Sequence, residues 1–215
     1  MKKKRVGVRL FKAFVLCILL LGIVGVAAGG VFVKHVIDNT PEVTAKDILP
    51  QGYTTSIVDQ NGTVLEQLKD SDSNRVYKKY DEISKYMGDA FVAIEDERFY
   101  KHNGIDLQGI IRAGVVGVTH GFHFTEGAST LTQQLIKNNV NETNSERFER
   151  KIQEQYLALK IEKQMSKKEI LEAYMNTINL GQGCLGVQTA AKRYFNKDAA
   201  DLTLSECAVI AGITQ

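Results

Sequence analysis

An uncharged apolar run near the N-terminus sets the first limit on what this chain can fold into. Residues 13–33 contain no charged side chain, and about twenty apolar residues are enough for a helix to cross the hydrocarbon core of a bilayer. Lysines and arginines are concentrated in the segment before the run, residues 1–12. The positive-inside rule places that basic tail in the cytoplasm and everything after the run outside. We therefore expect a single-pass transmembrane helix at 13–33.

A cleaved signal peptide is the alternative interpretation of this run. Its apolar region would be shorter, about 7–15 residues, and would end at a small-x-small cleavage site. The stretch at 26–29, Val-Ala-Ala-Gly, resembles such a site. Because the uncharged run exceeds the length that a signal peptide needs, retention as an anchor is the favoured interpretation.

The composition fits one globular domain in addition to the anchor. The chain has 215 residues, of which 44% are hydrophobic, and its net charge of +2 gives no sign of nucleic-acid binding. Three cysteines do not make a disulfide framework. Cys17 lies in the apolar run. Cys184 and Cys207 are expected to be free and partly buried, and a disulfide between them is the alternative.

Residue spacing predicts a mainly α-helical body with a small β-hairpin near the anchor. Residues 34–54 are expected to form a polar linker, and 55–68 a hairpin that turns at Asn61-Gly62. Helices are expected at about 81–99, 107–118, 131–138, 145–165, 167–178, 187–195 and 204–213. Three of them begin at the capping boxes Thr130-x-x-Gln133, Ser166-x-x-Glu169 and Thr203-x-x-Glu206. The chain stops within an apolar helix, so we expect the domain at 55–215 to be incomplete at its C-terminus.

The first chemically suggestive segment is the acidic end of the helix predicted at 81–99. At helical spacing Phe91, Glu95 and Phe99 share one face. Flanking aromatic rings would partly desolvate the carboxylate, as suits a general base. The alternative is a solvated acidic patch at a helix end.

Two further segments carry groups suited to binding phosphate or sugar. Around Ser129 and Thr130, a loop enters a helix whose first turn offers hydroxyls and free backbone N–H groups, with Lys137 about two turns further on. In Arg150-Lys151-x-x-Glu154, two cations beside an acid would suit a pyrophosphate leaving group. An ordinary helix cap and ordinary surface ion pairs are the alternatives.

Together these segments resemble the family-51 glycosyltransferases, the peptidoglycan polymerase domain of class A penicillin-binding proteins and of monofunctional transglycosylases. The resemblance runs from about residue 48 to the end and rests on five blocks in the order of the family. They are Glu95-Asp96-x-x-Phe99-x-x-His102-x-Gly104, Gly127-x-Ser129-Thr130-x-Thr132-Gln133-Gln134, Arg150-Lys151-x-x-Glu154, Lys168-x-Ile170-Leu171-Glu172-x-Tyr174-Met175-Asn176 and Leu202-Thr203-Leu204-x-Glu206-Cys207-Ala208. Small departures at Ala128, Met175 and Cys207 remove no polar group.

The resemblance implies a lysozyme-like fold whose jaw subdomain is partly embedded in the membrane, with a cleft for the growing lipid-linked strand and for lipid II. Glu95 matches the catalytic base that would deprotonate the 4-hydroxyl of the acceptor, so that this oxygen displaces the lipid pyrophosphate with inversion. Glu154 matches the second essential acid, near the leaving group. The positions that match groups shaping the cleft or neutralising the pyrophosphate are Asp96, Phe99, His102, Ser129, Thr130, Gln133, Gln134, Lys137, Arg150, Lys151 and Asn176.

The resemblance also implies cofactors and partners. A divalent cation, Mg²⁺ or Mn²⁺, assists in this family, although spacing indicates no ligand set here, and no organic cofactor is expected. The expected partners are lipid II, the growing glycan, the membrane and other cell-wall synthesis proteins, with no nucleic acid. The donor mimic moenomycin is the expected inhibitor, and the loop at 119–127 matches the flexible segment between the donor and acceptor sites.

Three alternatives to an active polymerase follow from the same residues. A glycoside hydrolase would also place two carboxylates in a lysozyme-like cleft, but hydrolysis needs no pyrophosphate clamp of the kind expected beside Glu154. A non-catalytic scaffold would bind other cell-wall synthesis proteins, and the intact Glu95 and Glu154 argue against it. The third is a member of the family that is inactive because the C-terminal end of its domain is missing.

Overall fold

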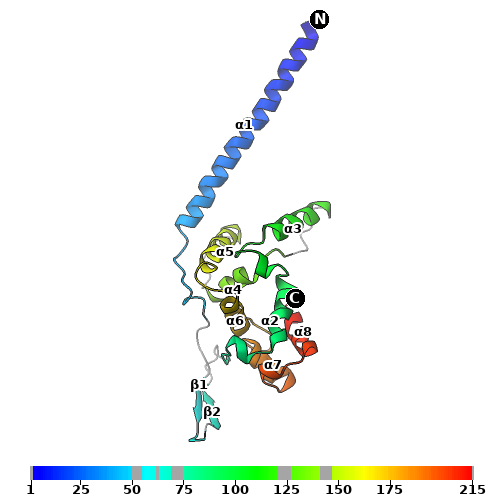
Figure 1. The fold of residues 1–215 in the computed structure, drawn as a ribbon. Helices are drawn as coiled ribbons and strands as arrows, with labels where there is room; N and C mark the ends of the chain where they lie inside the picture. Colours follow the sequence, from blue (N-terminus) through cyan, green and yellow to red (C-terminus); the bar gives the residue numbers. More distant parts are fainter. Residues whose placement is uncertain are drawn as a thin grey trace. The chain divides into compact units, whose positions relative to one another are not determined.

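The computed structural model describes residues 2–49, 55–61, 63–68, 75–120, 127–140 and 147–214. Figure 1 shows its helices and strands in sequence colours. The chain divides into two compact units. The first unit comprises Met1–Pro41 and Glu146–Gln153, and the second comprises Glu42–Ser145 and Glu154–Gln215.

The first unit is built on one long helix, α1 (Lys2–Asp38). Its portion Phe11–Asp38 is long and apolar enough to cross a membrane, and the large apolar side chains along it are exposed. A bilayer interior suits such a surface better than water, which opposes exposure of apolar area. The anchor predicted at 13–33 thus lies within a longer helix. In the same unit the rings of Phe32 and Phe148 stack with centroids 6.1 Å apart.

The hairpin prediction is confirmed by strands β1 (Thr55–Val58) and β2 (Val64–Leu68), which pair antiparallel. The register shifts between Ile57 and Val58. The Asp59 carboxylate accepts hydrogen bonds from the backbone N–H groups of Asn61 and Thr63, each at 2.8 Å, and so closes the turn. Gly62, the second residue of the predicted Asn-Gly turn, lies outside the described residues.

The rest of the second unit is helical, which confirms the mainly α class. Its helices are α2 (Lys85–Glu95), α3 (Leu107–Thr119), α4 (Leu131–Asn139), α6 (Lys167–Thr177), α7 (Val187–Phe195) and α8 (Leu204–Gly212), together with the later residues of α5 (Arg147–Ile161). Short 3-10 turns occur at Tyr80–Glu82, Phe99–Lys101 and Ala199–Asp201. Helix α2 packs against α8 and α4 packs against α6 (Figure 1).

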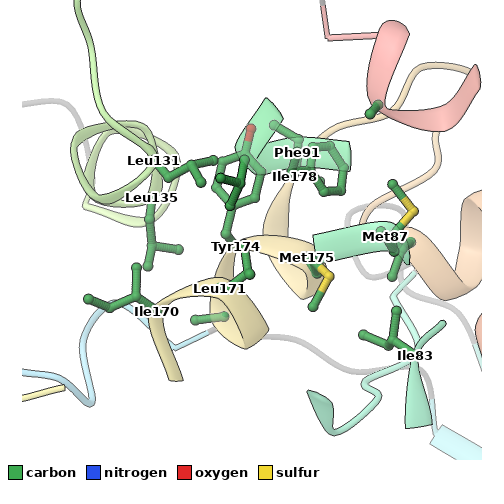
Figure 2. Close-up of a cluster of buried hydrophobic side chains, with 14 of the residues drawn as sticks. Ile83, Met87, Phe91, Leu131, Leu135, Ile170, Leu171, Tyr174, Met175 and Ile178 are labelled. Carbon is green, nitrogen blue, oxygen red and sulfur yellow. The ribbon is translucent and has the colours of Figure 1, made fainter. Parts of the chain in front are cut away.

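The core of this unit is centred on α6. Figure 2 shows Tyr174 of α6 between Leu131 and Leu135 of α4 on one side and Phe91 of α2 on the other. The rings of Phe91 and Tyr174 meet edge to face with centroids 5.2 Å apart, a geometry that the aromatic quadrupole favours. The core therefore joins α2, α4 and α6, the elements that carry the predicted base and its neighbours. The prediction of unbridged cysteines is also confirmed, because Cys184 and Cys207 are both buried free thiols.

The helix predicted at 81–99 is wrong at both ends. Helix α2 begins only at Lys85 and already ends at Glu95. Asp96 leaves helical geometry, with φ −157° and ψ 69°, and its carboxylate accepts a hydrogen bond from the backbone N–H of Leu131 at 3.0 Å. Phe99 lies in the following 3-10 turn, so it does not share a helix face with Glu95. The helix therefore ends because Asp96 forms this hydrogen bond with a residue 35 positions further along the chain.

Two of the three predicted capping boxes are complete, and the third forms only by half. Ser166 with Glu169 and Thr203 with Glu206 exchange both hydrogen bonds. The Thr130 hydroxyl accepts from the N–H of Gln133, but the Gln133 side chain donates instead to the carbonyl of Gly104 at 3.3 Å. The helix predicted at 145–165 also ends early, at Ile161.

Candidate active site

A cavity of about 170 Å³ lies beside the C-terminal end of α2. Residues 93–98 form one wall, Asp106, Gly109 and Arg112 form another, and residues 127–130 before α4 form a third. The fold thus brings together three segments that the sequence separates. Four predicted site residues lie in these walls: Glu95, Asp96, Ser129 and Thr130.

Glu95 is the last residue of α2 and is half-buried at the cavity wall. Its Oε2 atom accepts a hydrogen bond from Nε2 of Gln134 at 2.7 Å. Its Oε1 atom accepts from the hydroxyl of Thr214, which the packing of α8 on α2 brings near. Both of these donors are neutral side chains, and they fix the direction of the carboxylate. The carboxylate is therefore oriented at the cavity wall, and its role as a base stays a prediction.

Asp96 and His102 form a buried joint between the end of α2 and the start of α4. The Nε2 atom of His102 lies 2.9 and 3.0 Å from the two Asp96 oxygens, and Asp96 also accepts from the N–H of Leu131. Because the Nδ1 atom of His102 accepts from the N–H of Gly104 at 3.2 Å, Nε2 carries the proton that is donated to Asp96. These partners occupy both carboxylate oxygens inside the protein. Whether Asp96 and His102 contact a substrate stays a prediction.

Gly104 completes this joint because no other residue fits there. Its φ is +93°, and a Cβ added to it would lie 2.7 Å from the carbonyl carbon and oxygen of Ala158 on α5. Its own carbonyl accepts from the hydroxyl of Thr130 at 2.8 Å and from the side chain of Gln133. The glycine therefore lets the loop approach α5 closely while it fixes the beginning of α4.

Two arginine side chains and a second buried acid in the cavity were missed by the sequence predictions. The Nε atom of Arg98 donates to both oxygens of Asp106 at 3.1 Å, and Asp106 caps α3 by accepting from the N–H of Gln108. Burial acts to raise the pKa of Asp106, but the N–H of Gly109 and the Arg98 guanidinium outweigh it and hold that pKa below its usual value. Arg112 also lines the cavity, with its side chain exposed. The only sequence signal that could have indicated this role for Arg112 was its position more than one turn after the start of α3.

Other predicted site residues support the fold around the cavity and do not line it. Phe99 is fully buried beneath the ammonium group of Lys167, which lies 4.3 Å from the ring centroid. Asn176 is 1% exposed, and its amide both donates to and accepts from the backbone of Lys78 at 2.8 Å. Lys137 is exposed in the last turn of α4. Direct contact of these residues with a substrate stays a prediction.

The predicted acid and cations on α5 fall in different units. Arg150 and Lys151 are half-buried and belong to the first unit, whereas Glu154 is 4% exposed and belongs to the second. Their roles near a leaving group therefore stay predictions. The predicted flexible loop at 119–127 falls largely outside the described residues, which omit 121–126.

The expected divalent cation has no evident ligand set in the described part of the chain. No group of three or more histidine, cysteine or acidic side chains there could hold a metal ion. Mg²⁺ or Mn²⁺ stays a prediction of the resemblance.

Comparisons with known proteins identify the family of the chain. Residues 61–215 match the family model described as Transglycosylase. The chain is 43% identical over 210 residues to penicillin-binding protein 1A of Clostridium perfringens (strain 13), which covers 96% of this chain and 31% of that protein. It is 41% identical over 218 residues to penicillin-binding protein 1A of Clostridium botulinum (strain Langeland), covering 100% of this chain and 26% of the relative. For penicillin-binding protein 1A of Escherichia coli (strain K12) the identity is 40% over 210 residues, with 96% and 23% covered. The chain therefore spans less than a third of the length of each of these three relatives.

Proposed function

Because this chain belongs to the transglycosylase family, we propose that it is a peptidoglycan glycosyltransferase that polymerises lipid II into β-1,4-linked glycan strands and releases undecaprenyl pyrophosphate. The observation that carries this proposal is the Glu95 carboxylate, which neutral donors hold at the wall of a cavity. The three relatives, each a penicillin-binding protein 1A, support the same class of activity.

Glu95 is the best general base among the acids that line this cavity. Asp96 is buried, and both of its oxygens have partners inside the protein. Asp106 pairs with Arg98, and a carboxylate whose pKa is lowered is a weaker proton acceptor. Glu97 is exposed on the wall, where water screens its charge. Among the acids of the cavity that the structure describes, Glu95 alone combines an oriented carboxylate with a half-buried position.

The proposed reaction is an inverting displacement at the anomeric carbon. Glu95 accepts the proton of the acceptor 4-hydroxyl, and that oxygen forms a bond to the anomeric carbon of the donor. The bond from that carbon to the pyrophosphate oxygen breaks on the opposite face, and the pyrophosphate leaves with the electron pair. Lys137, Arg150 and Lys151 are proposed to neutralise its charge, and Glu154 to act beside it. The exposed side chain of Arg112 supports an anionic ligand in the cavity.

The membrane is the proposed location of this reaction. Helix α1 would span the bilayer with the basic tail in the cytoplasm, which places the second unit outside the cell membrane. Leu107, Ile111, Val115 and Val118 are exposed along α3 and recur at helical spacing. This apolar stripe supports a jaw that dips into the membrane surface, where a lipid-linked substrate would be found.

Polymerisation of fluorescent lipid II in detergent tests the proposal. We expect glycan ladders from the wild type that moenomycin suppresses, and at least about a 10²-fold lower rate for Glu95→Gln, because the base is lost while the side-chain shape remains. Lipid II should still bind to this variant. Glu97→Gln is the matched control, since it neutralises the acid two positions along on the same cavity wall, and it should retain most of the rate.

Two outcomes would overturn the proposal in different ways. Wild-type turnover by Glu95→Gln would remove the base assignment. A wild-type chain that makes no ladder but releases soluble fragments from finished cell wall would replace the polymerase with a hydrolase.

A further inference from the structure

We propose that Tyr174 is a positioning residue for Glu95 and acts through the side-chain amide of Gln134. The proposal deepens the proposed function, because it rests on Glu95 being the base. The three residues lie on α6, α4 and α2. A core tyrosine, an amide and the cavity carboxylate thus form one chain of hydrogen bonds.

The Tyr174 hydroxyl acts as a donor in this chain. It lies 3.1 Å from Oε1 of Gln134 and donates to it, while the ring is fully buried between α2 and α4 (Figure 2). Burial, with the negative charge of Glu95 as a second cause, raises the pKa of Tyr174. The phenol therefore keeps its proton throughout the pH range in which the protein would work.

A fixed donor at Oε1 decides which way the Gln134 amide points. A glutamine amide can exchange its oxygen and nitrogen by a half-turn about its last torsion, at little steric cost. With Oε1 held by the phenol, Nε2 faces Glu95 and donates to Oε2 at 2.7 Å. The flipped amide would place its carbonyl oxygen against the carboxylate, which would replace an attraction by a repulsion. Tyr174 thus selects the amide orientation that holds the base.

The support on the other carboxylate oxygen is less firm. Thr214 donates to Oε1 of Glu95, but the same hydroxyl lies 2.8 Å from the carbonyl oxygen of Ala211. A threonine hydroxyl has a single proton for these two acceptors. Of these two donors, Gln134 is therefore the firmer support for Glu95, and loss of its anchor should misdirect the lone pair that faces the cavity.

Kinetics of lipid II polymerisation with a double-mutant cycle test this inference. Tyr174→Phe keeps the ring and its packing against Phe91 and removes only the hydroxyl. We expect kcat to fall about 10-fold with KM unchanged, because orientation matters for the chemical step and not for binding. Gln134→Ala should lower kcat by at least the same factor. The double variant should be no slower than Gln134→Ala, since Tyr174 acts through that residue.

Tyr194→Phe is the matched control. It also removes a tyrosine hydroxyl bonded inside the fold, here one that donates to the carbonyl of Leu180 at 2.7 Å, and it should leave kcat unchanged. The relay is contradicted by a wild-type kcat for Tyr174→Phe, or by losses that multiply in the double variant. Failure of the base assignment is separate, because only that failure would leave Glu95→Gln active.

Discussion

Glu95 and Asp96 are neighbours in the sequence, yet the fold gives the two carboxylates opposite environments. Glu95 ends α2 at the cavity wall and is held by the side chains of Gln134 and Thr214. Asp96 turns inward, where His102 and the backbone N–H of Leu131 take up its oxygens. One carboxylate remains accessible to a ligand, and the other joins two helices.

The difference shows that the local environment, and not the motif, decides whether a carboxylate is placed at the cavity or within the architecture of the fold. At Glu95, the side chains of Gln134 and Thr214 fix the direction of a carboxylate that lies at the cavity wall. At Asp96, burial makes the loss of any partner costly, because an unpaired buried polar group loses its hydration without compensation. The two positions should therefore respond differently to mutation.

Removal of the buried carboxylate should have the largest effect on stability. We expect Asp96→Ala to lower the free energy of unfolding by about 3 kcal/mol, because His102 and the N–H of Leu131 lose their partner inside the protein. Glu95→Ala, the matched change one position earlier, should cost less than about 1 kcal/mol, since water can reach that site. Urea unfolding followed by tyrosine fluorescence measures both, as the chain has no tryptophan. Equal losses would remove the distinction between the two carboxylates.

Substitution of Gly104, which lies close to the backbone of α5, should give the next largest loss of stability. Gly104→Ala should destabilise the protein by at least about 2 kcal/mol, because alanine disfavours a positive φ and its Cβ would meet the backbone of Ala158. Gly127→Ala on the cavity wall is the control, since an added Cβ there meets no atom of the described residues within 4 Å. The same unfolding measurement compares them. If Gly104→Ala were as stable as Gly127→Ala, the backbone around residue 104 would be able to move and accommodate a Cβ.

A third carboxylate, Asp106, extends the comparison, because the stability that it contributes should depend on pH. Its pKa is lowered in the folded state, so the stability it contributes is present above its unfolded pKa and is lost as pH falls through the folded one. Asp106→Asn keeps a good helix cap and removes the charge that faces Arg98, so it should cost about 1 kcal/mol near neutrality. Melting temperatures from pH 7 down to pH 3 should show the deficit shrinking. A deficit independent of pH would mean that the charge contributes nothing.

Local rules explain the parts of this fold that the sequence predicted well. The complete capping boxes at Ser166 and Thr203 and the hairpin next to Asp59 depend on residues within a few positions of one another. The anchor depends on apolar character alone. Glu95 was predicted from its spacing and from the family blocks.

Long-range contacts explain the parts that could not be predicted. Helix α2 ends at Glu95 because Asp96 finds its partner on α4, and neither residue reveals the other in the sequence. Thr214 reaches Glu95 across 119 positions, and Tyr174 reaches Gln134 across 40. No periodicity or motif spacing encodes such pairs. The same limit explains why Arg112 was not predicted to line the cavity, since only the folded position of α3 places it there.

The most direct test of this account is to measure lipid II polymerisation and melting temperature together for Glu95→Gln and Asp96→Asn. We predict that Glu95→Gln melts with the wild type and forms no glycan ladder. Asp96→Asn should melt at a lower temperature but still polymerise at temperatures where it is folded. A folded Glu95→Gln that polymerises at the wild-type rate would contradict the central claim that Glu95 is the base.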